Sequence, residues 1–185
     1  MIISTIFIAF SRALNLANYQ HFMTRIGLIS DTHGFLDDAV FKHFDKCDQI
    51  WHAGDFGSGV ADKLRSFKPL QGVYGNIDGY EIRSEFPEKL RFTCEGINVL
   101  MIHIGGYPGR YTSLAKAELR TEPSKLFISG HSHILKVIYD EKIKCLHMNP
   151  GAAGKHGWHK VRTLIRFVVD GDNMRDCEVI ELGPR

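Results

Sequence analysis

Acidic, amide and imidazole side chains recur directly after apolar runs that have the length of buried strands. Asp31 and His33 follow the first such run, and Asp55 follows the second. Later runs are followed, or ended, by Asn76, Asp78, His103, His131 and His133. In open α/β sheets, ligands bind outside the carboxyl ends of the strands. Several separate loops are therefore expected to bring these metal-type side chains to one edge.

Each of these motifs is a weak signal by itself. Asp31-Thr32-His33 and Gly54-Asp55 are also ordinary loop and turn sequences. His131-Ser132-His133 is more informative, because alternate residues of an extended segment could reach two metal ions from one turn. The order and placement of all the motifs together indicate a metal site.

The hydrophobic pattern predicts the elements that must position these side chains. Short apolar runs followed by turn residues are typical of buried strands, and apolar residues at helical spacing are typical of helices. Strands are predicted over 25–30, 48–55, 70–78, 90–96, 97–103, 125–130, 134–140, 142–148, 162–170 and 174–182, and helices over 37–45, 59–67 and 112–121. The alternation of strand and helix in the first third implies parallel strands. The whole pattern predicts stacked sheets with flanking helices in one α/β domain.

Composition places the chain among ordinary globular proteins. Its 185 residues suggest one domain, because a typical domain has roughly 150 residues. The hydrophobic share of 44% and the charged share of 24% exclude a disordered chain and a polytopic membrane protein. The formal net charge of +2 gives no general attraction to nucleic acid or anionic lipid. The four cysteines are far apart, which predicts reduced, mostly buried thiols in a cytoplasmic protein.

Residues 1–22 precede Met23 and the first predicted strand. The apolar run from Ile2 to Phe10 is too short to cross a bilayer, which takes about 20 residues. It also fits a secretory signal poorly, because Arg12 follows the run instead of preceding it. We therefore expect residues 1–22 to be an extension and residues 24–185 to form a single domain. A targeting segment and a helix packed on the domain are the alternatives for the extension.

Taken in order, the motifs resemble those of the calcineurin-like metallophosphoesterases. The family pattern D-x-H, G-D, G-N-x-D, H and G-H-x-H stands here as Asp31-Thr32-His33, Gly54-Asp55, Gly75-Asn76-Ile77-Asp78, His103 and Gly130-His131-Ser132-His133. The short chain and Asn149-Pro150-Gly151 are similar to the small single-domain YfcE-like phosphodiesterases of bacteria and archaea. The resemblance implies a four-layer αββα sandwich of two stacked mixed β-sheets flanked by helices, with a two-metal site.

The resemblance also implies how two divalent ions would be held. One ion would take Asp31, His33, Asp55 and His133, and the other Asp55, Asn76, His103 and His131, so that Asp55 bridges the pair. Oxygen and imidazole ligands together suit manganese, iron or zinc better than magnesium or calcium. We expect manganese first, with iron, zinc or nickel as alternatives. Two such ions would attract a phosphate and activate the attacking water.

One position departs from many members of the family. Ile77 stands where they carry a histidine that assists the leaving group, although the small-phosphodiesterase branch also tends to lack it. Losing a general acid costs roughly 10²–10⁴-fold in rate, so we expect slow turnover that is best with good leaving groups. Asp78 is expected to orient a ligand histidine, which makes it a catalytic candidate beside Asp55, Asn76 and His103.

Residues outside the motifs give weaker predictions. Arg110 lies in a Gly- and Pro-rich loop and is a candidate substrate contact together with Asn76, against the alternative of a solvated arginine on a surface loop. His52 is expected in the core or behind the ligands, whereas His21, His43 and His147 are expected to be structural or exposed. Another set of residues is expected to rim the site or a partner surface, or to form a plain loop: Lys155, His156, Trp158 and His159.

Three functions compete for this sequence. The leading one is a metal-dependent phosphodiesterase that hydrolyses a small phosphate ester through a water activated by two metals. The alternative is a catalytically weak or inactive protein-binding scaffold of the same fold, like the retromer subunit among its relatives. A nuclease is disfavoured because a net charge of +2 offers no basic face. No specific nucleic acid or membrane partner is evident, and a homo-oligomer is left open.

Overall fold

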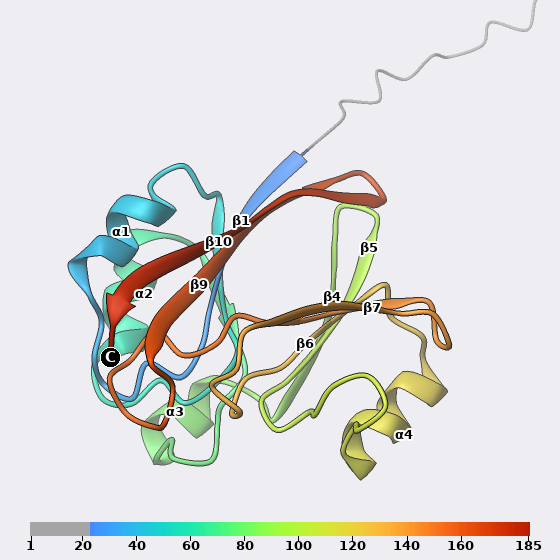
Figure 1. Ribbon diagram of the computed structural model, residues 1–185, viewed down its shortest axis with the longest axis horizontal. Helices are drawn as coiled ribbons and strands as arrows, with labels where there is room; N and C mark the ends of the chain where they lie inside the picture. The colour runs from blue at the N-terminus through green and yellow to red at the C-terminus, as the bar shows by residue number, and fades with distance from the viewer. Residues whose placement is uncertain (1–22) are drawn as a thin grey trace, which may run out of the picture.

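The computed structural model describes residues 23–185, so the predicted extension over residues 1–22, and His21 within it, lie outside the described residues. Two five-stranded sheets face each other within this part of the chain (Figure 1). Each sheet contains both parallel and antiparallel neighbours. The predicted pair of stacked mixed sheets is therefore confirmed.

The first sheet has the strand order β10-β9-β1-β2-β3. Its strands are β1 (Met23–Ile29), β2 (Gln49–His52), β3 (Leu70–Gly72), β9 (Val161–Asp170) and β10 (Asn173–Pro184). Strands β1, β2 and β3 are parallel neighbours, as the strand–helix alternation predicts. The C-terminal hairpin of β9 and β10 joins them through an antiparallel pairing of β9 with β1.

The second sheet has the strand order β4-β5-β6-β8-β7. Its strands are β4 (Lys89–Cys94), β5 (Ile97–Ile102), β6 (Leu126–Ile128), β7 (Lys136–Asp140) and β8 (Cys145–Asn149). The two predicted hairpins, β4 with β5 and β7 with β8, are both formed. Strand β6 lies parallel to β5 and β8 in the middle of the sheet, so its carboxyl end is enclosed on both sides.

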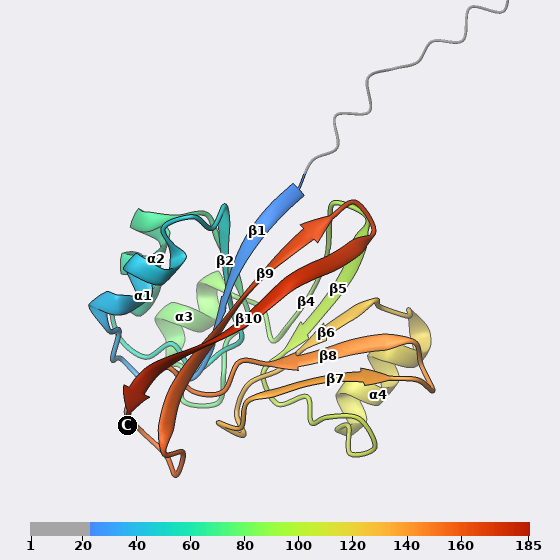
Figure 2. The same ribbon diagram turned by 45° about the horizontal axis from the view of Figure 1, so that its top comes forward.

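Helices cover the outer face of each sheet. They are α1 (Asp38–Phe44), α2 (Val60–Phe67), α3 (Tyr80–Glu85) and α4 (Ser113–Thr121). Phe44 of α1 and Leu64 of α2 are fully buried in one cluster with Ile50 of the first sheet. Ala115 and Leu119 of α4 pack in a separate cluster against the second sheet. Figure 2 shows the resulting order of helices, sheet, sheet and helix.

The largest core lies between the two sheets. Leu28 and Trp51 enter it from the first sheet, and Met101 and Ile128 enter it from the second, all fully buried. Burial of such a side chain contributes roughly 1.5–3 kcal/mol, so this apolar layer joins the sheets firmly. The predicted four-layer αββα sandwich is confirmed.

The largest differences between the predicted and the observed elements concern one strand and one helix. The strand predicted over 70–78 ends at Gly72, because Tyr74 turns its backbone N–H to the carbonyl of Pro87, at 3.0 Å, instead of to the sheet. Helix α3 was not predicted: it has six residues and buries none of them, so it leaves no apolar periodicity in the sequence.

The remaining global expectations concern thiols and membranes. All four cysteines are free, and Cys177 alone among them is exposed, in agreement with reduced and mostly buried thiols. None of the helices within residues 23–185 combines the length and the hydropathy that a bilayer crossing requires.

Candidate metal centre

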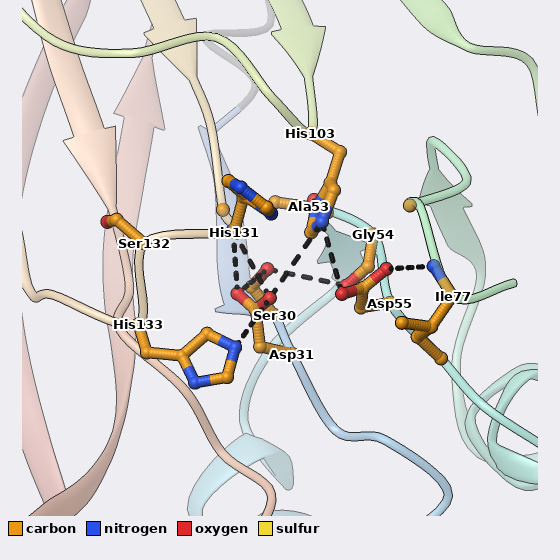
Figure 3. A network of polar contacts seen from close by, with 12 residues as sticks. Ser30, Asp31, Ala53, Gly54, Asp55, Ile77, His103, His131, Ser132 and His133 are labelled. Atoms are coloured by element: carbon orange, nitrogen blue, oxygen red, sulfur yellow. Dashed lines mark hydrogen bonds and ion pairs between the residues drawn. The ribbon is translucent and has the colours of Figure 1, made fainter. Parts of the chain in front are cut away.

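Six of the predicted ligands form two adjacent groups at the carboxyl ends of four strands (Figure 3). The first group consists of Asp31, His33 and His133, and the second group consists of Asp55, His103 and His131. Within each group, one donor atom of every residue lies within 4.8 Å of the others. The loops after β1 and β6 serve the first group, and those after β2, β5 and β6 serve the second.

Two carboxylates connect the groups. Asp55 Oδ2 lies 3.3 Å from His103 Nε2 of its own group and 3.6 Å from His33 Nε2 of the first group. Asp31 Oδ1 lies 3.3 Å from His133 Nε2 and 3.9 Å from His103 Nε2. The bridging position that the family resemblance implies for Asp55 is therefore geometrically available, and Asp31 also reaches toward both groups.

The outer oxygens of both carboxylates are held by hydrogen bonds. The backbone N–H of Ile77 donates to Asp55 Oδ1 at 3.0 Å. The hydroxyl of Ser30 donates to Asp31 Oδ2 at 2.6 Å, and the backbone N–H of His131 donates to the same oxygen at 3.1 Å. These contacts fix the carboxylate planes, so that one oxygen of each faces the histidines.

The ligand residues adopt an uncommon backbone conformation. Five of the six have positive φ: Asp31 (53°), His33 (47°), Asp55 (57°), His131 (65°) and His133 (57°). Such conformations cost about 1–3 kcal/mol each in residues other than glycine and cluster at functional sites. The loops tolerate them because backbone hydrogen bonds tie one loop to the next, for example from Asp31 N to the Gly54 carbonyl and from His33 N to the Asp55 carbonyl, both at 3.0 Å.

Glycines allow the chain to approach the ligands closely. A Cβ atom added at Gly75 would lie 2.0 Å from Asp55 Oδ1, and one added at Gly130 would lie 2.2 Å from Ser30 Oγ. A Cβ atom at Gly157 would lie 2.2 Å from His133 Nδ1. Any side chain at these positions must displace a ligand or the residue that supports it.

His103 has the arrangement of a metal ligand. Its Nδ1 lies 2.7 Å from the Ala53 carbonyl and donates to it, which leaves the Nε2 lone pair facing Asp55. Nε2 is buried and has no hydrogen-bond partner among residues 23–185. Burial lowers the pKa of His103, but the neighbouring Asp55 and Asp31 carboxylates outweigh it and raise the pKa overall. A cation beside this buried acceptor would satisfy it, so the residues present fit a metal ion.

The histidines of the first group contact each other and a second pair of histidines. His33 Nε2 lies 3.2 Å from His133 Nε2. The His156 ring lies 4.8 Å from the His33 ring, and the His159 ring lies 5.2 Å from the His133 ring. Burial lowers the pKa of His33, against the opposing effect of the Asp55 and Asp31 charges. The segment containing His156 and His159 thus rims the site, which was one of its predicted roles.

The remaining predicted residues lie around the groups in different ways. Asn76 is exposed and lines a pocket together with His103. Asp78 is buried, but it does not orient a histidine as predicted: its carboxylate accepts hydrogen bonds from the backbone N–H groups of Phe56, Gly57 and Gly75. It therefore fixes the loops after β2 and β3.

Arg110 is exposed, and it contacts neither group and lines neither of the pockets beside them within the described residues. Its role as a substrate contact stays a prediction. His52 is fully buried behind the site, 3.0 Å from the Thr32 hydroxyl, as expected.

One supporting residue was not predicted. Arg83 of α3 donates to the carbonyl of Asp78 at 2.6 Å and to those of Gly75 and Asn76 at 3.3 Å each. It thereby fixes the loop that carries Asn76. No sequence motif predicts this role of Arg83, because its partners are backbone carbonyls and helix α3 shows no apolar periodicity.

The family model of the calcineurin-like phosphoesterase superfamily domain matches residues 24–172. The chain belongs to this superfamily. Membership of this superfamily confirms the resemblance drawn from the ordered motifs. The metallophosphoesterase fold implies that the protein binds divalent metal ions. Comparison with curated proteins finds no significant match.

Solved structures of the same fold include one described as a phosphodiesterase and several described as Vps29. An archaeal phosphodiesterase is 20% identical over 85% of this chain and 99% of its own, with a TM-score of 0.65. Vacuolar protein sorting 29 of Cryptosporidium parvum is 17% identical over 88% of this chain and 99% of its own, with a TM-score of 0.69. Vps29 of Entamoeba histolytica, solved with zinc, is 16% identical over 85% of this chain and 98% of its own, with a TM-score of 0.60. At these identities the likeness establishes the fold alone.

Proposed function

We propose that this superfamily member is a metal-dependent phosphoesterase, and specifically a phosphodiesterase that hydrolyses a small phosphate ester. The observation that carries the proposal is the pair of ligand groups joined by Asp55, whose Oδ2 lies within 3.6 Å of a histidine nitrogen of each group. A domain that kept only the fold would have no need for five ligand residues with positive φ.

The chain's own residues would hold two ions in the proposed site. Asp31, His33 and His133, with Asp55, form one ligand set, and Asp55, His103 and His131, with Asn76, form the other. Divalent ions bound there supply Lewis acidity toward the phosphate and activate water. The two carboxylates leave a formal positive excess when both ions are present, which favours an anionic substrate. Manganese is the proposed metal, with iron, zinc or nickel as alternatives for the same donors.

Leaving-group chemistry limits the proposed activity. Ile77 is 47% exposed beside Asp55, and its side chain has no proton to give to a departing alkoxide. We therefore propose slow turnover and a preference for acidic leaving groups. The archaeal phosphodiesterase of the same fold supports the reaction class, and the zinc-bound Vps29 supports metal binding by such a fold. A single domain over residues 24–185 and a cytoplasmic location complete the proposal.

A protein-binding scaffold is the second candidate. Apolar side chains are exposed along the edge strand β7 and the residues before it: Ile134 (59%), Val137 (40%), Ile138 (41%) and Tyr139 (49%). An exposed apolar edge is typical of an interaction surface. The phosphoesterase and the scaffold differ in one measurable property: only the phosphoesterase hydrolyses a substrate at the metal site.

One experiment separates the candidates. The purified protein is depleted of metal, reloaded with Mn²⁺, Zn²⁺ or Fe²⁺ and analysed for bound metal. Each form is then assayed with bis(p-nitrophenyl) phosphate as the diester and p-nitrophenyl phosphate as the monoester. We expect metal-dependent hydrolysis, faster for the diester. A protein that retains two ions but hydrolyses neither compound refutes the enzyme and leaves the scaffold.

A further inference from the structure

His159 lies beside the first group and has a buried nitrogen without a partner. Its Nε2 lies 3.0 Å from the Gly154 carbonyl. Because a carbonyl oxygen only accepts, Nε2 carries a proton and donates it to this contact. In the neutral ring Nδ1 is then an acceptor, and it is buried with no hydrogen-bond partner among residues 23–185. Most buried polar atoms of native proteins are paired, so this acceptor points to a role that the first group supplies.

Backbone contacts fix the His159 ring relative to the ligand loops. The Gly154 N–H donates to the Asp31 carbonyl at 3.0 Å, and the Ala153 N–H donates to the Ser30 carbonyl at 3.0 Å. The Gly154 carbonyl that receives His159 Nε2 is therefore tied to the loop after β1. Burial lowers the pKa of His159, which favours the neutral ring. The Nδ1 lone pair thus has a fixed position beside the first group.

His133 Nδ1 borders the same space as His159 Nδ1. A Cβ atom added at Gly157 would lie 2.2 Å from His133 Nδ1 and 3.4 Å from His159 Nδ1, so both nitrogens lie close to one point beside the Gly157 backbone. The centres of the two rings are 5.2 Å apart. The His33 and His133 rings have the same separation, and there two nitrogens lie 3.2 Å from each other. A small rotation of the His133 ring is therefore enough for a direct contact between the two Nδ1 atoms.

Ion binding determines which nitrogen of His133 carries the proton. Its Nε2 lies 3.3 Å from Asp31 Oδ1 and 3.2 Å from His33 Nε2, so an ion of the first group takes this nitrogen. The other nitrogen points away from the carboxylates (Figure 3). A neutral imidazole has one proton, and coordination at Nε2 leaves that proton on Nδ1. His133 then has a donor that needs an acceptor, and His159 has an acceptor that needs a donor.

We propose that His159 is a positioning residue of the metal site: its Nδ1 accepts a hydrogen bond from His133 Nδ1–H and so orients His133 for the ion of the first group. Ligand histidines generally have such an outer partner, which fixes their tautomer and orientation. His159 serves His133 as the Ala53 carbonyl serves His103. The proposal rests on the metal site of the proposed function but not on the reaction performed there.

Two substitutions separate the roles of the two His159 nitrogens. The amide of asparagine branches at the position of Nδ1, so His159→Asn keeps an acceptor for His133 and loses the donor to Gly154. The amide of glutamine reaches the position of Nε2, so His159→Gln keeps that donor and loses the acceptor for His133. Glutamine therefore replaces a residue that only holds the loop, whereas asparagine replaces the proposed positioning residue.

The Mn²⁺ affinity of each group is measured by calorimetry on the full chain. In the His103→Ala background, which reports on the first group, we expect His159→Gln to weaken Mn²⁺ about tenfold and His159→Asn less than about threefold. In the His33→Ala background, which reports on the second group, both substitutions should change the affinity less than about twofold. Lys160→Gln, at an exposed neighbouring position, is the control and should leave both affinities unchanged.

A spectroscopic measurement tests the hydrogen bond itself. In the Zn²⁺-loaded protein with ¹⁵N-labelled histidine, we expect the Nδ1–H proton of His133 to give a slowly exchanging NMR signal. This signal should disappear in His159→Gln and persist in His159→Asn. Absence of the signal from the parent protein overturns the proposal. An equal loss of first-group affinity in the two variants, or a larger loss in His159→Asn, also overturns it.

The same titrations separate this proposal from the proposed function. A protein that hydrolyses the aryl diester, but in which His159→Gln and His159→Asn bind Mn²⁺ equally, keeps its function and refutes the role of His159. A protein that shows the expected difference between these variants but hydrolyses no ester keeps the role of His159 and refutes the phosphoesterase.

Discussion

The two ligand groups contain the same kinds of donor but are built differently. In the second group, Asp55 and His103 are buried, and the Ala53 carbonyl fixes the imidazole through its other nitrogen. In the first group, His33 and His133 are only partly buried, and their Nε2 atoms lie 3.2 Å from each other. Their outer faces meet the rings of His156 and His159.

This difference concerns preorganisation. A ligand histidine whose second nitrogen is hydrogen-bonded has a fixed tautomer and orientation, which increases metal affinity. His103 meets this condition. His33 and His133 have no hydrogen bond at their second nitrogens within residues 23–185, and His131 of the second group is exposed, so His103 alone gives the second group this advantage. We infer that the second group is the more rigid of the two and that the first adapts when its ion binds. The carboxylate of Asp55 is the part they share.

Asp55→Ala should have the largest effect, because it removes a donor from both groups at once. We expect metal content to fall from two ions to less than one and hydrolysis of the aryl diester to fall at least about a thousandfold, the loss of several kcal/mol of electrophilic stabilisation. Metal analysis and steady-state kinetics measure the two effects. Asp62→Ala, which removes an exposed carboxylate on α2, is the matched control and should leave both unchanged.

Activity that survives Asp55→Ala with one ion still bound would show that the groups act independently. The bridging assignment of Asp55 would then be wrong, and Asp31, whose Oδ1 also faces histidines of both groups, would be the shared ligand.

Most of the site was predictable because its residues follow strands. Asp31, Asp55 and His103 each come directly after a short buried run or its turn, and parallel strands place their carboxyl ends together. The same logic predicted both sheets and three of the four helices. Local pattern suffices where burial and chemistry alternate along the chain.

What could not be predicted depends on backbone geometry. The positive φ of His33 or His131 leaves no mark in the sequence, since neither residue is a glycine. Asp78 was expected to hold a histidine but accepts from three backbone N–H groups, because the loops after β2 and β3 curl around it. Arg83 contacts carbonyl oxygens, and carbonyl oxygens belong to every residue type. Such roles become visible only when the loops are folded.

Glycine substitutions should separate the groups with smaller effects. Gly75→Ala puts a Cβ 2.0 Å from Asp55 Oδ1, which must then move. We therefore expect both ions to bind more weakly and the rate of diester hydrolysis to fall about a hundredfold. Gly157→Ala, at φ 115°, crowds His133 instead, and we expect it to weaken only the ion of the first group, by about tenfold. Gly79→Ala has open space around its Cβ and is the control. Metal titrations that give the same pattern for Gly75→Ala and Gly157→Ala would contradict the division into two groups.

Acidification should distinguish the groups by the smallest but most specific effect. An ion binds neutral imidazole, so each group loses affinity below the pKa of its histidines, by about tenfold per pH unit for each proton displaced. The pKa of His103 is raised, because Asp55 and Asp31 outweigh its burial, whereas burial lowers the pKa of His33. As pH falls from about 8 to about 6, the second group should therefore lose metal affinity first, although it is the more rigid.

Calorimetric Mn²⁺ titrations of two variants measure this order. Those of His33→Ala report on the second group, and those of His103→Ala report on the first. The opposite result would be that the first group, measured in His103→Ala, loses Mn²⁺ affinity at a higher pH than the second group, measured in His33→Ala. The carboxylates would then not control the pKa of His103 as proposed.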